Sequence, residues 1–318
     1  MDRSATIDVR GHATRVGLRD CLAEGDAMLA GIEPILGHLL SAPDHSLFSD
    51  EIIARVRGML AHVARQILLV QAETEGSTSY ALTAERHEKP LAHHFQSCSA
   101  LLTLCHALAI EWQLAQRLEA ETGLDPVLSP LLQRWIADPV AGVSSGAMAV
   151  LAAQARYAQS QRRMELGLGE LPAEVFHQTL LTWRSYTGEQ RSDGPRHAEV
   201  RLRREFDESK GRLALLERLV GGSQGSEALA LEEAGAALFF SALSTRSGQP
   251  RAMAVLSSHA RQAARFVLGL RAAGVKPRAI DEALLRIHPG AAPFDGLAEI
   301  DELSARGILL DSLHRQGR

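Results

Sequence analysis

Apolar residues recur every three or four positions along most of the chain, which is the spacing that buries one face of an α-helix. One such segment follows a Ser49 N-cap and ends near Gly76, with apolar positions at Ile52, Ile53, Val56, Met59, Leu60, Val63, Ile67 and Val70. A second begins near Pro90 and ends near Gly123, with its stripe at Leu91, His94, Phe95, Cys98, Leu101, Leu102, Cys105, Leu108 and Trp112. We therefore predict two long helices, each with one buried face.

The remainder of the chain is punctuated by prolines at intervals that suit the first turns of helices. They occur at Pro126, Pro139, Pro172, Pro195, Pro250 and Pro277. Composition agrees, because 48 alanines and 47 leucines outweigh 27 valines and isoleucines among the 318 residues, and strands favour the second group. The predicted fold class is all-α, a multi-helix bundle followed by stacked helical-hairpin repeats.

Two polar, glycine-rich stretches at residues 187–194 and 221–226 divide the pattern. We predict an N-terminal helical bundle over residues 1–190, a charged helix and linker over 191–224, and a C-terminal helical-repeat module over 225–318.

The C-terminal module contains an internal similarity at an offset of 27 residues. Seven positions are identical between residues 234–256 and 261–283, including the pairs Phe239/Phe266 and Pro250/Pro277. In each copy, small alanines permit close helix approach, a phenylalanine fills the interface and a proline starts the next helix. The pattern favours stacked helical pairs, and two unrelated amphipathic helix pairs are the alternative.

The run from Ala237 to Val275, with Ile287, His288 and Pro289 after it, resembles the C-terminal part of an alphaproteobacterial domain-of-unknown-function family with HEAT-like helical pairs. The resemblance covers about a quarter of the chain. It implies a helical-repeat fold and carries no catalytic motif with it. The 27-residue period is shorter than the usual HEAT unit.

Charge and cysteine content narrow the class of partner and the compartment. The net charge of −4 gives no bulk attraction to nucleic acid. The three cysteines, Cys21, Cys98 and Cys105, are too few for a disulfide framework in a chain of this length. No signal-peptide pattern or uninterrupted apolar stretch of membrane-spanning length occurs, so we predict a cytoplasmic protein that binds neither nucleic acid nor membrane.

Thirteen histidines raise the alternative of a helical metal- or ligand-binding protein or enzyme. His87 opens the densest cluster, and His94 and Cys98 have the i, i+4 spacing that can hold one zinc ion. Cys105 lies about 10 Å further along a helix axis, too far to share that ion. Glu174 and His177 form one Glu-x-x-His pair, where a di-iron bundle needs two. His94, Cys98, Glu174 and His177 are the candidate ligands of this alternative, and a leucine-rich core face with buried thiols is the competing interpretation.

Other catalytic patterns are incomplete. Gly142 to Gly146 matches Gly-x-Ser-x-Gly but lacks a preceding strand, and none of the three lysines follows a glycine as a phosphate-binding loop requires. The most basic stretch, residues 191–218, interleaves eight basic with six acidic residues. Such a balance favours a solvated helix with i, i+4 ion pairs.

The sequence therefore favours a non-enzymatic helical scaffold or adaptor for protein–protein interaction, with no cofactor. Arg251 and Arg278 are the candidate partner-binding residues, since they recur in register after helix-starting prolines. A protein partner is expected, and homodimerisation is an alternative.

Overall fold

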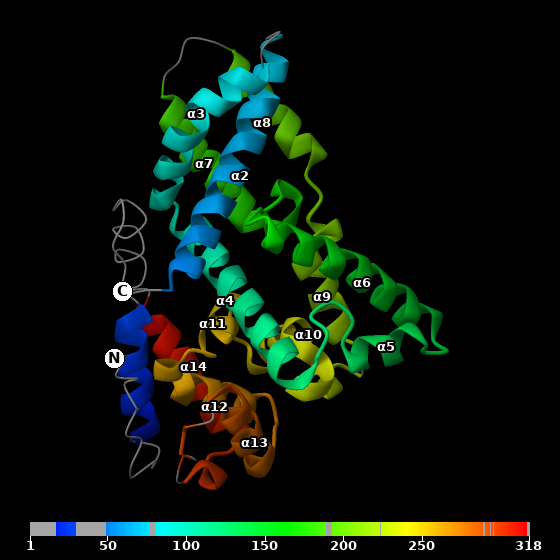
Figure 1. Ribbon diagram of the computed structural model, residues 1–318. Coiled ribbons are helices and arrows are strands. Elements are labelled where there is room, and N and C mark those ends of the chain that lie inside the picture. The colour runs from blue at the N-terminus through cyan, green and yellow to red at the C-terminus, as the bar shows by residue number, and fades with distance from the viewer. Residues whose placement is uncertain are drawn as a thin grey trace. The chain divides into compact units, whose positions relative to one another are not determined.

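The structure is a computed structural model in which residues 17–29, 49–76, 80–188, 193–222, 224–288, 290–292, 294 and 296–316 are described. Every regular element within these residues is a helix (Figure 1), which confirms the all-α prediction. Besides a helix over 17–29, the α-helices are α2 (Asp50–Thr74), α3 (Tyr80–His94), α4 (Ser99–Thr122), α5 (Pro130–Ile136), α6 (Ala141–Arg162), α7 (Ala173–Thr187), α8 (Gly194–Glu205), α9 (Arg212–Val220), α10 (Leu231–Ser247), α11 (Arg251–Leu256), α12 (Ala263–Ala272), α13 (Pro277–Ile287) and α14 (Glu302–Gln316).

The first predicted helix is confirmed as α2, which ends just before Gly76 in the left-handed region (φ +68°). The second prediction is wrong in its boundaries. Pro90 lies inside α3 instead of starting a helix, and the chain breaks at Cys98 (ψ 89°) before α4 begins. The predicted stripe still faces the core, because all of its members except the half-buried His94 are buried.

No single helix within the described ranges has the length and apolar character needed to cross a membrane. The helical segments 84–97 and 99–122 reach that threshold only when taken together, and they meet at 97°.

The chain divides into two compact units, each built from separate segments. Unit 1 comprises residues 1–32, 114–137 and 217–318, and unit 2 comprises residues 33–113 and 138–216. Two of the unit boundaries fall within α4 and α9, so the division differs from the three consecutive segments predicted above. Residues 194–205, within the predicted charged helix and linker, form the helix α8, which packs in unit 2 with Ala198 and Leu202 buried.

In unit 2, four helices are arranged so that α2 contacts α3 and α8, and α7 contacts the same two helices (Figure 1). The core side of α2 is formed by fully buried side chains, Val56, Met59, Val63 and Ile67. Burial of each contributes about 1.5–3 kcal/mol. This arrangement leaves one side of α7 and one side of α8 facing solvent.

In unit 1, α12 is the central helix, since every residue from Ala263 to Leu270 is buried. It packs against α10, α13 and α14. The internally similar segments form the helix pairs α10–α11 and α12–α13, and the equivalent rings of Phe239 and Phe266 lie 6.0 Å apart, centroid to centroid. Left-handed glycines, Gly248 and Gly274, end the first helix region of each pair.

A buried ion pair fixes the helix over 17–29 within unit 1. Arg265 of α12 has no exposed surface, and its Nη2 donates to Asp26 at 2.5 Å and to Ser312 of α14 at 2.6 Å. Gln262 donates to the carbonyl of Gly25, where an added Cβ would meet the Gln262 amide nitrogen at 2.8 Å. The glycine permits this close approach.

Candidate functional site

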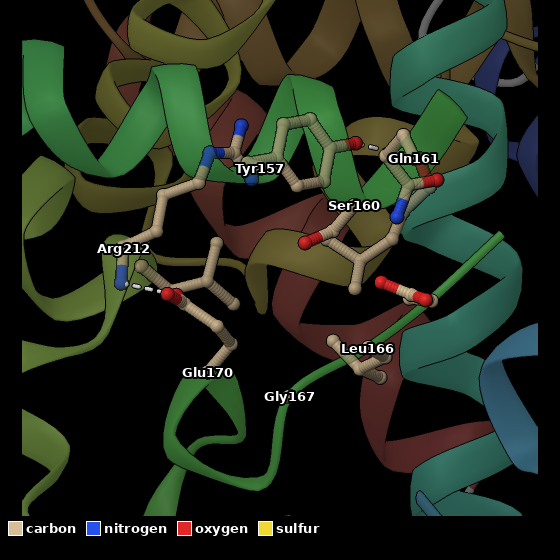
Figure 2. Close-up of a pocket in the computed structure, with 10 residues that line it drawn as sticks. Tyr157, Ser160, Gln161, Leu166, Gly167, Glu170 and Arg212 are labelled. Carbon is tan, nitrogen blue, oxygen red and sulfur yellow. Dashed lines mark hydrogen bonds between the residues drawn. The ribbon is translucent and has the colours of Figure 1, made fainter. Parts of the chain in front are cut away.

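Arg212, at the start of α9, is one of the two most deeply buried charged residues that the structure describes in unit 2, and it is 2% exposed. Its Nη2 donates to Glu111 of α4, which is 1% exposed, and its Nε donates to Gln154 of α6 at 2.7 Å. The guanidinium lies 3.7 Å from the ring centroid of Tyr157 (Figure 2), a cation–π contact. Burial alone would lower the pKa of Arg212, but Glu111 and Tyr157 offset this effect, so that its pKa is raised.

A small cleft opens beside this cluster. Figure 2 shows Tyr157, Ser160, Gln161, Leu166, Gly167, Glu170 and Arg212 around it. Gln66 of α2 holds the wall by donating to the carbonyl of Leu166 at 2.9 Å and accepting from the amide of Leu168 at 3.0 Å. Glu170 accepts from the backbone amide of Arg212 at 2.7 Å.

The cleft has a volume of about 20 Å³, which is room for about one water molecule. Pockets that enclose organic ligands are more than ten times larger. Two buried polar atoms at the cleft, Nη1 of Arg212 and Oε1 of Gln161, have no hydrogen-bond partner among the described residues, and a water would suit this donor and acceptor. The Arg212 cluster is therefore a buried polar cluster whose adjoining cleft is too small for an organic ligand.

The candidate metal ligands do not gather, because the described part of the chain contains no group of three or more His, Cys, Asp or Glu side chains placed to hold an ion. On α3, His94 Nε2 lies 2.9 Å from the hydroxyl of Ser185. That hydroxyl donates to the carbonyl of Thr182 at 2.7 Å, so His94 is the donor in its contact with Ser185. In this arrangement Nε2 carries the ring hydrogen and is engaged by Ser185.

Two of the other three candidate ligands have hydrogen-bond partners of their own, and the third is a buried thiol. Glu174 accepts from Gln178 at 2.9 Å, and Nδ1 of His177 accepts from the guanidinium of Arg203 at 3.3 Å. Cys98 is a buried free thiol. Burial, with Cys98 adding to the effect, raises the pKa of the Cys105 thiol, which opposes formation of a metal-binding thiolate.

The two arginines predicted to bind a partner lie in different environments. Arg251 folds back onto α10, where its Nε donates to the Ser241 hydroxyl at 3.0 Å. The side chain of Arg278 is 93% exposed and pairs with Glu282 at 3.2 Å. Only Arg278 is therefore directed fully into solvent.

A different surface of unit 2 combines basic and exposed apolar side chains. Arg203 of α8 contacts His177 of α7, and Arg184 of α7 lies 3.5 Å from Glu199 of α8. As residue numbers rise on α7 they fall on α8, so the two helices are antiparallel. Along the two helices, Leu181 lies between His177 and Arg184, and Val200 lies between Glu199 and Arg203.

We call this surface the α7–α8 face and define it by six residues: His177, Leu181, Arg184, Arg196, Val200 and Arg203. Each helix contributes a basic residue, then an apolar residue four positions on, then a basic residue three positions further, which is one helical stripe. Leu181 is 39% exposed and Val200 is 63% exposed. Glu199 is paired with both Arg184 and Arg203 while its own side chain is only 14% exposed.

The pairing leaves the face positively charged, because one carboxylate compensates only one of the two guanidiniums. Arg184 retains 61% of its side-chain exposure. A guanidinium only donates, so Nδ1 of His177 is an acceptor and the neutral ring carries its proton on Nε2. The face therefore offers hydrogen-bond donors beside two exposed apolar side chains.

Sequence reasoning missed both features for identifiable reasons. It treated Arg212 as part of a solvated basic stretch, although Glu111, isolated in the apolar run of α4, indicated a buried charge that needs a counter-ion. The α7–α8 face combines residues from two helices, so its pattern emerges only once the helices pair. The predicted i, i+4 ion pairs are present at Arg201–Glu205 and Arg203–Glu199.

Comparison of the chain with protein-family models, with curated proteins and with solved structures gives no match. The family resemblance in the C-terminal quarter stays a prediction.

Proposed function

We propose that this chain is a non-enzymatic helical adaptor that binds a protein partner through the α7–α8 face. The observation that carries the proposal is that two exposed apolar residues, Leu181 and Val200, each lie between basic residues on one of two antiparallel helices that contact each other. Protein interfaces enclose apolar side chains within a polar rim and are enriched in arginine. The α7–α8 face has this composition.

Its rigidity also supports the role. Trp183 of α7 is fully buried, and Phe176 of α7 stacks on Phe206, just after α8, with ring centroids 4.0 Å apart. Helices fixed in this way lose little conformational entropy when a partner binds.

We also propose that the helix pairs α10–α11 and α12–α13 are two copies of one HEAT-like hairpin. The equivalent positions of Phe239 and Phe266 in the unit 1 core support this. The cytoplasm is the compartment we propose, because the buried Cys98 and Cys105 are free thiols.

Photocrosslinking in the native host tests the adaptor role. A photoreactive amino acid is incorporated into the full chain at position 200, and in a control at position 285, which is exposed on α13. We expect one protein to be crosslinked from position 200, and the crosslink to disappear when Arg184→Glu and Arg203→Glu are combined. An equal set of crosslinks from both positions, or a crosslink unaffected by the charge reversals, would overturn the proposal.

A further inference from the structure

The charge and shape of the α7–α8 face define the kind of partner that fits it. This step rests on the proposed adaptor function. The face is about 10 Å long, since seven residues of a helix rise 1.5 Å each. Along the helices, Leu181 lies between His177 and Arg184, and Val200 lies between Arg196 and Arg203. The contact of His177 with Arg203 brings one end of the two stripes together.

A third helix packs on a pair of antiparallel helices with its apolar stripe along the apolar positions of the pair. The partner helix that matches the face would carry an acid, an apolar residue three or four positions later, and a second acid seven positions after the first. This spacing is that of the stripes on α7 and α8, with acids in place of the basic residues. The carboxylates of the partner helix would meet guanidiniums, and charge-assisted hydrogen bonds between these groups are among the strongest in proteins.

The charge balance of the face favours an acid over other groups. The stripe on α8, Arg196, Val200 and Arg203, contains no acid, and the Glu199 carboxylate beside it is already paired with two arginines. A basic helix would place like charges opposite one another, which is destabilising. A neutral apolar helix would cover guanidiniums without pairing them.

We infer that the α7–α8 face binds an acidic amphipathic helix of the partner protein, with its apolar side chain seated between Leu181 and Val200.

Binding of synthetic helical peptides to the full chain, followed by fluorescence anisotropy, tests this inference. The first peptide carries the stripe of acid, leucine and acid; a second replaces the leucine by serine, and a third replaces the acids by lysine. We expect saturable binding of the first peptide and at least tenfold weaker binding of the other two. Equal binding of all three, or no binding of the first, would overturn the inference.

Variants of the protein locate the binding surface. Val200→Glu places an acid at the centre of the face without removing an ion pair, so the fold is retained, and at least tenfold weaker binding is expected. Combined Arg184→Glu and Arg203→Glu has the same predicted effect, with melting by circular dichroism as the folding check. The control combines Arg278→Glu with Arg286→Glu on α13, where both arginines are exposed. It changes the net charge by the same amount as the Arg184→Glu and Arg203→Glu pair and should leave binding unchanged. Loss of binding in this control instead would overturn the inference and favour the α13 surface.

The crosslinked segment of the native partner separates the inference from the function on which it rests. An acidic helix crosslinked at position 200 supports both. A basic or non-helical segment of a protein crosslinked there would leave the adaptor function standing and overturn the inference. RNA or anionic vesicles that compete with the acidic peptide at equal charge concentration would also overturn it, since the apolar centre would then contribute nothing.

Discussion

Replacement of Arg212 by methionine should destabilise unit 2 severely. Arg212 and Glu111 are both at least 98% buried, and removing one member of a buried pair costs about 3–5 kcal/mol because the other charge is left without its counter-ion. The variant also loses the cation–π contact with Tyr157, worth about 1–2 kcal/mol when desolvated. Because the two losses overlap, we expect about 4 kcal/mol in total. A domain of this kind is stabilised by about 5–15 kcal/mol, so the effect is readily measured.

Urea unfolding followed by tryptophan fluorescence can report on unit 2 alone. Trp112 and Trp183 lie in unit 2 and Trp135 lies in unit 1, so a Trp135→Phe background removes the signal of unit 1. Arg212→Met in that background should lower the urea midpoint by an amount equivalent to about 4 kcal/mol.

The matched control restores neutrality to the buried site. Arg212→Met combined with Glu111→Leu removes both charges, and apolar replacement of a buried pair is close to neutral in stability. The double variant should therefore be more stable than Arg212→Met alone. The reasoning would be refuted if Arg212→Met unfolded within about 1 kcal/mol of the parent, or if the double variant were no more stable than the single one.

The remaining predictions concern glycines, a histidine and the helix over 17–29. Gly58→Ala should destabilise unit 2 by about 1–3 kcal/mol in urea unfolding, because its Cβ would meet the Met164 carbonyl oxygen at 2.6 Å. Gly307 is exposed and an added Cβ would meet nothing within 4 Å, so Gly307→Ala should instead stabilise unit 1 by up to about 1 kcal/mol. Equal effects of the two substitutions would contradict this prediction. Burial, with Arg117 and His259, lowers the pKa of His288 to about 4, so unit 1 should lose stability as the pH falls from about 6.5 toward 4. His288→Gln should reduce that loss, as measured by urea unfolding across this pH range. If the stability of the variant and of the parent protein changed with pH in parallel, the assignment to His288 would be wrong. Arg265→Met should abolish hydrogen-exchange protection over 17–29 and spare α2, whereas unchanged exchange over 17–29 would mean that the Asp26 pair does not anchor it.

The fold class and much of the buried surface could be predicted from the sequence because they depend on local spacing. The apolar stripe of α2 is buried as expected. The boundary at Pro90 was predicted wrongly because proline is usually found in the first turn of a helix. In the structure Pro90 lies inside α3, which packs against α2 and α7. The two discontinuous units depend on contacts between distant segments, such as Arg265 with Asp26, which no local pattern contains.

The candidate site was less accessible to sequence reasoning than the fold. The sequence drew attention to His177 as a possible ligand, and the structure places it on the α7–α8 face as a partner of Arg203. Leu181 and Val200 carry no sequence signal, because single exposed apolar residues are common on protein surfaces. Only the contact between α7 and α8 brings the two stripes that contain them onto neighbouring helices.

Hydrogen–deuterium exchange of the full chain, with and without the partner identified by crosslinking, tests the central claim most directly. The account predicts slower exchange over residues 177–185 and 196–204 in the complex, with no change in α13 and α14. Protection confined to α13 and α14, or protection over 177–204 that persists in Val200→Glu, would contradict it.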